Sequence, residues 1–260
     1  MKKLAFAVVM GIIASSASAD IWSNGSVVTH TGIGAGGNDI SAFNVDPLTT
    51  TFGLQVGYEA SGIGPASLAD DFTVNGNVLL TKLTTYAYVT NNGDPGFTGA
   101  YVRIYSGNPA SGGTLVYGDM VTSRLAGSGV YVDGNGKNVY RTSGSTGAAA
   151  TNTQRKLQKV DITLGNVALG AGTYYAAWSL QSGAGTSIFT PSLGRRGNGL
   201  QELTSNGVPT WGPALGTATN ANSGVDLPFD LEYSAVPEPG TMIAVGAGLV
   251  ALAARRRRKA

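Results

Sequence analysis

The chain has few of the side chains that usually carry out catalysis. His30 is its single histidine, and it contains no cysteine. A serine-hydrolase triad needs a histidine base and a nucleophile on a strained turn, yet no Gly-x-Ser-x-Gly sequence occurs. One imidazole cannot form a histidine-based zinc site, and the lack of thiols excludes cysteine catalysis and cysteine-ligated zinc. We therefore expect His30 to be an exposed polar residue of a glycine-rich segment.

Carboxylates are the next candidates, because a glycoside hydrolase needs only two acids at a defined separation. Asp70 and Asp71 are the only adjacent pair of acids. Neighbouring side chains on a strand point to opposite faces, so these two would not face each other across a substrate. The other acids are scattered as on an ordinary solvated surface. A secreted hydrolase is therefore the least favoured function.

Two loops carry residue types whose oxygens bind calcium. They are Asn91-Asn92-Gly93-Asp94 and Asp133-Gly134-Asn135-Gly136, in which Asp94 and Asp133 are the candidate ligands. Neither loop ends in the glutamate that closes an EF-hand. Asn-Gly and Asp-Gly also form ordinary hairpin turns, and this alternative is the favoured one. We expect no other metal and no organic cofactor.

Aromatic residues are numerous for a glycine-rich chain. Tyr86 and Tyr88 share one face of an expected strand, as do Tyr101 and Tyr105. An exposed row of such rings would stack on sugars, whereas a buried row would pack in a core or across strands. Packing is the favoured interpretation. The other members of the set are Tyr117, Tyr174, Tyr175, Trp178 and Trp211.

These residues must be positioned by strands, because apolar and polar residues alternate with a period of two. The clearest case is the segment from Leu227 to Tyr233, where Pro228 suits an edge or the first residues of a strand. Further strands are expected at 52–58, 83–89, 101–105, 160–164 and 174–180. Glycine-rich turns separate them, and the pattern predicts an all-β, antiparallel, jelly-roll-like β-sandwich. The segment from Thr142 to Thr153 reads as a long exposed loop or as a linker between two domains.

Charge is divided unevenly between the ends of the chain and its body. Seven of the 17 Lys and Arg residues lie in the two ends, with only Glu238 of the 15 acids. The stretch from Asp20 to Ala235 therefore holds 10 basic and 14 acidic residues. This acidic balance gives no sign of a nucleic-acid partner.

The N-terminus has the three parts of a secretory signal. Lys2 and Lys3 precede an apolar run from Leu4 to Ile13, and Ala17 and Ala19 form the small-x-small cleavage pattern. A membrane anchor is the alternative, but the run is short for one and a cleavage site follows it directly. We expect the export machinery to translocate the chain and signal peptidase to cut it after Ala19.

The C-terminus has three parts in a different order. Pro237, Glu238 and Pro239 come first, an uncharged apolar segment runs from Thr241 to Ala254, and a basic cluster closes the chain. The cluster is Arg255, Arg256, Arg257, Arg258 and Lys259. Five adjacent cations do not fit a protein core, but they hold a short helix end on the cytoplasmic side by the positive-inside rule. The two prolines keep the peptide around Glu238 extended, as a protease requires.

These three parts in this order resemble the sorting signal of PEP-CTERM proteins, the substrates of exosortases. The resemblance covers residues 236–260 and implies that an exosortase acts at Pro237, Glu238 and Pro239, with Arg255 to Arg258 as the stop-transfer cluster. It also implies a transient stay in the inner membrane, followed by release to the cell surface or the extracellular space of a bacterium that makes exopolysaccharide. The chain then divides into a signal peptide at 1–19, a secreted β-domain at 20–235 and a sorting tail at 236–260.

The body also resembles, more distantly, a β-sandwich module of secreted bacterial proteins. The residues that carry this likeness include Asp70-Asp71-Phe72-Thr73-Val74 and Gly172-Thr173-Tyr174-Tyr175. The likeness implies only fold and location, and no catalytic residues. We expect a non-enzymatic structural or adhesive component of the surface or of the exopolysaccharide matrix. A carbohydrate-binding module is the first alternative and a secreted hydrolase the second.

The tail gives the first prediction. Replacing Arg255 to Arg258 with Ser should leave the protein soluble and unprocessed, because a 14-residue apolar segment holds weakly without its topological stop. Glu238→Ala leaves insertion intact, so this variant should accumulate uncut in the inner membrane. Cell fractionation and intact mass distinguish the two outcomes. Arrival of both variants at the surface with normal mature mass would show that the tail is not a sorting signal.

Overall fold

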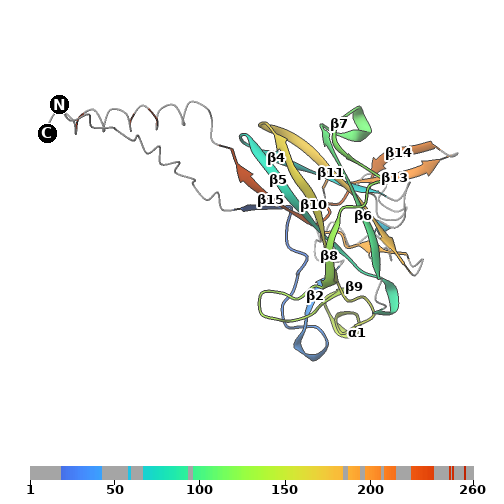
Figure 1. Ribbon diagram of the computed structural model, residues 1–260. Helices are drawn as coiled ribbons and strands as arrows, with labels where there is room; N and C mark the ends of the chain where they lie inside the picture. Colours follow the sequence, from blue (N-terminus) through green and yellow to red (C-terminus); the bar gives the residue numbers. More distant parts are fainter. Residues whose placement is uncertain are drawn as a thin grey trace, which may run out of the picture.

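The computed structural model describes residues 19–42, 58–59, 67–92, 96–183, 187–193, 197–205, 208–214 and 224–236, together with residues 246, 248 and 255 (Figure 1). These residues form strands joined by turns and a few short helices. The strands are β1 (Asp20–Ser23), β2 (Asp39–Ala42), β3 (Tyr58–Glu59), β4 (Leu68–Val74), β5 (Val78–Ala87), β6 (Phe97–Ser106), β7 (Thr114–Asp119), β8 (Leu125–Val130), β9 (Val139–Thr142), β10 (Gln158–Leu169), β11 (Gly172–Ser182), β12 (Phe189–Thr190), β13 (Leu200–Ser205), β14 (Val208–Pro213) and β15 (Phe229–Ala235). The helical turns are η1 (Ala35–Gly37), η2 (Thr90–Asn92), η3 (Pro109–Ser111) and α1 (Gly147–Ala150).

Two antiparallel sheets make up most of the fold. One has five strands in the order β1-β15-β5-β10-β8, and the other has six in the order β14-β13-β4-β11-β6-β7. Eight of these strands, taken as β1, β4, β5, β6, β7, β10, β11 and β15, form the arrangement β1-β15-β5-β10 opposite β4-β11-β6-β7. That is the strand order of a jelly roll, with β8 added at one edge and the β13–β14 hairpin at the other.

The inner faces of the two sheets bury one continuous apolar core. Trp178 of β11 is fully buried, and its ring centroid lies 5.6 Å from that of Phe229 on β15. Phe72 of β4 stacks on Tyr174 at 5.7 Å. The core takes residues from every strand of the jelly roll's centre, including Leu83, Ile104 and Ile162. This shared burial is what holds the sheets face to face.

The period-two pattern predicted these inner faces correctly. The expected strands at 101–105, 160–164 and 174–180 lie within β6, β10 and β11, and the one at 83–89 lies in β5 as far as Ala87; the expected residues turn inward, among them Leu83 and Ala87. The expected strand at 227–233 begins at Phe229, directly after Pro228. The expected strand at 52–58 falls on residues that are not described, apart from Tyr58.

A bulge in β10 lets both halves of that long strand contribute to the core. The register to β5 shifts between Thr163 and Val167, where Gly165 and Asn166 both have positive φ angles. Glycine and asparagine are the residues that adopt this conformation at least cost. As a result Ile162 and Leu164 point inward before the bulge, and Val167 and Leu169 do so after it.

A smaller unit covers one end of the five-stranded sheet. β2 and β9 pair in parallel, and Figure 1 shows them with α1 below β8. The expectation of a purely antiparallel body is therefore wrong at this point, because about 100 residues separate the two strands and a crossover that long can return the chain in parallel. Tyr86 of β5 and Tyr88, which follows the end of that strand, belong to one apolar cluster with Val139 of β9.

The expectation of an exposed loop at 142–153 is also wrong in part. Thr142 is buried within β9, and Ala150 of α1 packs on Ile40 and Ala42. β8 and β10, which flank this segment, pair with each other in one sheet. The segment is therefore a packed excursion from that sheet, which argues against the linker alternative.

The first and last strands of the body lie side by side. β1 pairs with β15 in antiparallel register, with Asp20 opposite Tyr233. The expected signal helix and the expected C-terminal helix lie outside the described residues, except for helical residues 246, 248 and 255. Across the described part of the chain, no helix has the length and apolar character needed to cross a bilayer.

The core gives the second prediction. Trp178→Ala should lower the free energy of unfolding by about 3–5 kcal/mol, because it removes a fully buried ring. Trp211→Ala is the matched control on the outer face of the six-stranded sheet, where the ring is only half-buried, and its cost should be clearly smaller. Urea unfolding followed by circular dichroism measures both. Equal losses would mean that the inter-sheet core does not dominate stability.

Candidate functional site

A groove lies on the outer face of the five-stranded sheet, at the end covered by the β2–β9 unit. Its volume is about 370 Å³. The residues that line it come from β1, β5, β8, β10 and β15 and from the segment after β8: Ile21, Thr84, Tyr86, Val130, Tyr131, Val132, Lys159, Asp230 and Glu232. Several apolar members are well exposed, since Ile21 keeps 66% of its surface and Val132 keeps 49%. The groove therefore offers both apolar and charged surface to a ligand.

Tyr86 is the centre of the groove. Its hydroxyl donates a 2.6 Å hydrogen bond to Oδ2 of Asp230, and its ring meets Tyr131 edge to face at 5.1 Å. Burial and then the bond to Asp230 raise the pKa of Tyr86 well above its ordinary value, so the phenol stays protonated and remains a donor. Burial also raises the pKa of Tyr131. The two rings are thus held in fixed orientation.

Charged side chains surround this aromatic pair. Lys82 forms a 2.5 Å ion pair with Glu232 and lies 3.9 Å from Asp161, which also pairs with Lys159 at 3.4 Å. Thr84 donates a 2.7 Å hydrogen bond to Asp161. The bond to Glu232 is the main reason that the pKa of Lys82 is raised. Rows of ionised groups beside an aromatic face suit a polyhydroxylated ligand, which can exchange hydrogen bonds with them.

The predicted aromatic set is mostly buried, as the packing interpretation expects. Tyr86, Tyr88, Tyr101 and Tyr105 are each at most 8% exposed. Tyr175 and Trp178 are buried as well, while Tyr117, Tyr174 and Trp211 are half-buried. No continuous exposed row forms among these residues. Tyr131 was not in the predicted set, and its position in the groove depends on the fold of the segment after β8.

The outer face of the six-stranded sheet carries a second polar cluster. Arg103 of β6 binds Glu202 of β13 through two hydrogen bonds, of 2.5 and 3.4 Å, and also donates to Ser67. Its guanidinium lies 5.4 Å from the ring centre of Trp211 and 5.7 Å from that of Tyr105. The ion pair is mostly buried and joins β13 to β6 across the sheet, although Arg103 Nε is buried with no hydrogen-bond partner among the described residues.

Asp70 and Asp71 point to opposite faces, as predicted, and the consequence is that Asp70 faces the core. It is fully buried on β4. Its Oδ2 accepts hydrogen bonds from Asn24 Nδ2 at 2.8 Å and from the Leu227 amide at 2.7 Å. Burial raises the pKa of Asp70 to about 8, although these donors act in the opposite direction. A carboxyl group enclosed in this way cannot reach a substrate, and its contacts give it a structural role.

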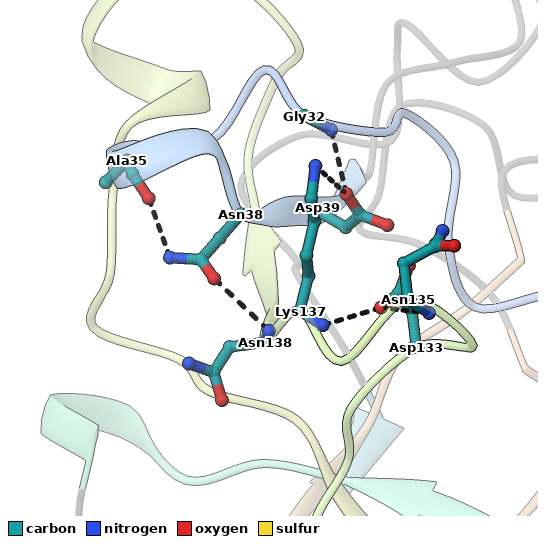
Figure 2. A network of polar contacts seen from close by, with 8 residues as sticks. All are labelled: Gly32, Ala35, Asn38, Asp39, Asp133, Asn135, Lys137 and Asn138. Carbon is teal, nitrogen blue, oxygen red and sulfur yellow. Dashed lines mark hydrogen bonds and ion pairs between the residues drawn. The ribbon is translucent and has the colours of Figure 1, made fainter.

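The candidate calcium loop at 133–136 forms the tip of a hairpin, as the favoured interpretation of an ordinary hairpin turn predicts. The Asp133 amide donates to the Lys137 carbonyl, and Oδ1 of Asp133 accepts from the Lys137 amide at 2.6 Å (Figure 2). That last bond is the main cause of a lowered pKa at Asp133, and bonds with Asn135 act in the same direction. Asp94 lies outside the described residues. The described part of the chain contains no group of three or more His, Cys, Asp or Glu side chains that could hold a metal ion.

Two further polar residues were absent from the predicted set. Arg141 of β9 is fully buried and donates to Ser41 and to both the carbonyl and hydroxyl of Ser192. Asp39 of β2 is 1% exposed. His30, expected to be exposed, is half-buried, because its backbone pairs with Ile40 and its ring contacts Thr29. The sequence around these residues has no period, so no local signal indicated their burial.

The comparisons with known proteins concern the tail. Residues 235–258 match the PEP-CTERM protein-sorting motif. The chain carries a PEP-CTERM sorting signal. The match includes Pro237, Glu238 and Pro239 and the cluster from Arg255 to Arg258, of which only Arg255 is described, in helical conformation. No curated protein and no solved structure matches the chain.

The motif implies that exosortase sorts this PEP-CTERM protein to the cell surface. Of the residues expected at the signal-peptidase site, Ala19 is described and exposed, and Ala17 lies outside the described residues. The groove is formed by residues of the described body, whereas Pro237, Glu238 and Pro239 lie outside the described residues. Sorting and any activity of the body therefore depend on different parts of the chain.

Asp70 gives the third prediction. Its folded pKa of about 8 lies above the ordinary value of 3.8, so the folded state binds more protons than the unfolded chain between these values. This group's stabilisation is therefore full at acid pH and falls as pH rises through that window, by at most about 1.4 kcal/mol per pH unit. Asp70→Asn should abolish this slope.

The measurement is urea unfolding of the wild type and the variant from about pH 4 to about pH 9. The difference between the two curves isolates Asp70 from all other titrating groups. Asp71→Asn, one residue away and outside the core, is the control and should keep the wild-type slope. A wild-type stability that rises relative to Asp70→Asn across this window would contradict the prediction.

Proposed function

We propose that the exported body is a non-enzymatic, adhesive or structural component of the cell surface or of the exopolysaccharide matrix. The sorting motif at residues 235–258 carries this proposal, because it directs the chain to the place where such a component acts. The architecture supports it. A sandwich that buries its apolar residues between two sheets leaves two broad outer faces for contact with other surface material.

Carbohydrate is the ligand class that the groove favours. Half-buried Tyr131, which packs edge to face on the buried ring of Tyr86, offers an apolar ring surface, and Lys159, Asp230 and Glu232 offer charged hydrogen-bonding groups around it. Sugars present apolar ring faces bordered by hydroxyl groups that both donate and accept, which matches this combination. An open groove on a sheet face also suits a polymer better than it suits a small molecule, which needs an enclosed pocket.

The function gives the fourth prediction. The exported protein should bind the exopolysaccharide of its own host on a glycan array or in a pull-down. Tyr131→Ala should weaken that binding at least about tenfold, or about 1.4 kcal/mol, because it removes half of the aromatic pair. Trp211→Ala is the control, since it removes an aromatic ring from the other sheet and should leave binding unchanged.

The result separates the two forms of the proposal. A protein that stays in the matrix but binds no glycan would favour a structural role through protein contacts. Glycan binding that Tyr131→Ala and Trp211→Ala weaken equally would place the binding outside the groove. Release of the mature protein into the medium, with no retention at the surface or matrix, would contradict the proposal as a whole.

A further inference from the structure

The polar network at the start of β2 contains a buried carboxylate of which only one oxygen has a partner. Asp39 is 1% exposed. Its Oδ1 accepts a 2.8 Å hydrogen bond from the Gly32 amide and lies 3.9 Å from the Lys137 ammonium group. Its Oδ2 is buried and has no hydrogen-bond partner among the described residues. A buried carboxylate oxygen without a partner is costly and requires an explanation, and a bound ion is one.

A second carboxylate lies beside it. The backbone brings the two together, because the Asp39 amide donates to the Asn138 carbonyl at 3.0 Å while Asn138 pairs with Val132 next to Asp133. Lys137 contacts both carboxylates, since its amide donates to Asp133 Oδ1 and its ammonium group lies 3.9 Å from Asp39 Oδ1. Figure 2 shows the free oxygen of Asp39 turned toward the hairpin that carries Asp133 and Asn135. Two carboxylates on neighbouring segments in this arrangement can share a cation as ligands.

Lys137 supplies only part of the required charge. Its ammonium group is on the Oδ1 side of Asp39, and its side chain is 42% exposed. Oδ2 of Asp39 therefore remains without a partner among the described residues. The two carboxylates and this single ammonium group together retain one negative charge. The groups available to an ion here are carboxylate oxygens of Asp39 and Asp133, while the Asn135 carboxamide nitrogen donates to Asp133 Oδ2 at 3.1 Å and holds that carboxylate in place. Calcium binds such irregular oxygen sets, whereas magnesium demands a near-ideal octahedron and zinc prefers nitrogen and sulfur.

We propose that Asp39 and Asp133 bind a calcium ion between β2 and the 133–136 hairpin. The ion binds the free oxygen of Asp39. It thereby connects two segments that are otherwise held by backbone hydrogen bonds and by the ion pair of Lys137 with Asp39. It stabilises the β2–β9 unit, on which Tyr86 and Tyr88 pack. This site is independent of glycan binding. Its affinity should be that of an extracellular module, with a Kd of about 10⁻⁴–10⁻³ M.

The test measures calcium binding by the exported protein after treatment with EDTA. Titration with calcium chloride in a calorimeter should show one site in this range. At ten times the Kd, calcium should raise Tm by about 3–6 °C. Asp133→Asn should weaken binding at least about tenfold, while its carboxamide oxygen can still accept the Lys137 amide bond, so the hairpin should persist. Absence of any heat and of any Tm shift in the wild type would overturn the proposal.

Two further variants make the outcome specific. Asp119→Asn is the matched control, because Asp119 caps a turn with the same kind of bonds, to the Val121 and Thr122 amides, and no buried carboxylate is described beside it. Its calcium affinity should equal the wild type's. Lys137→Gln removes the competing cation and should tighten calcium binding severalfold. If Lys137→Gln binds no calcium and only loses stability, Lys137 is the sole counterion of Asp39 and the proposal is wrong.

Discussion

Burial of two apolar sheet faces against each other is the constraint from which the rest of the structure follows. Trp178, Phe72 and Phe229 lie at the centre of that interface. Because successive side chains alternate across a strand, each residue that the core takes fixes its neighbours on an outer face. Tyr86, Asp230 and Glu232 line the groove because Leu83, Phe229 and Leu231 are buried on the other side of the same strands. The core thus determines which residues a ligand can meet.

Asp70 is the one acid that the inter-sheet core accepts among the described residues, and it connects the two sheets. It belongs to β4 of the six-stranded sheet, whereas its partners Asn24 and Leu227 directly follow β1 and precede β15 of the other. The Asn24 amide in turn donates to the Phe229 carbonyl. These bonds fix where β1 and β15 enter their sheet, and so they position Ile21 and Asp230 in the groove. A polar residue in the core therefore contributes to the geometry of a site that it does not touch.

How far the sequence could be interpreted depended on whether a feature is local. Alternation identified the strands and their inner faces, since Ile104 and Trp178 need no knowledge of their partners. The sorting tail was also identifiable, because its motif is linear. The parallel pairing of β2 with β9 and the meeting of Tyr131 with Tyr86 join residues far apart in the chain. For Asp70 the sequence did contain a signal, because it lies two and four residues before the apolar Phe72 and Val74, and alternate residues of a strand point to the same face. No comparable hint existed for Asp39 or Arg141.

The pairing of β1 with β15 makes the sorting tail compatible with a folded body. Asp20 lies opposite Tyr233, so the start of the sandwich and the beginning of the tail are at the same end of one sheet. β15 ends at Ala235, two residues before Pro237. The last strand is therefore complete before the motif begins, and Val236 still donates its amide to Asn77. A cut at the Pro-Glu-Pro motif removes no strand and no core residue of the described sandwich. The described sandwich, with its outer-face groove, is therefore made entirely of residues that precede the Pro-Glu-Pro motif.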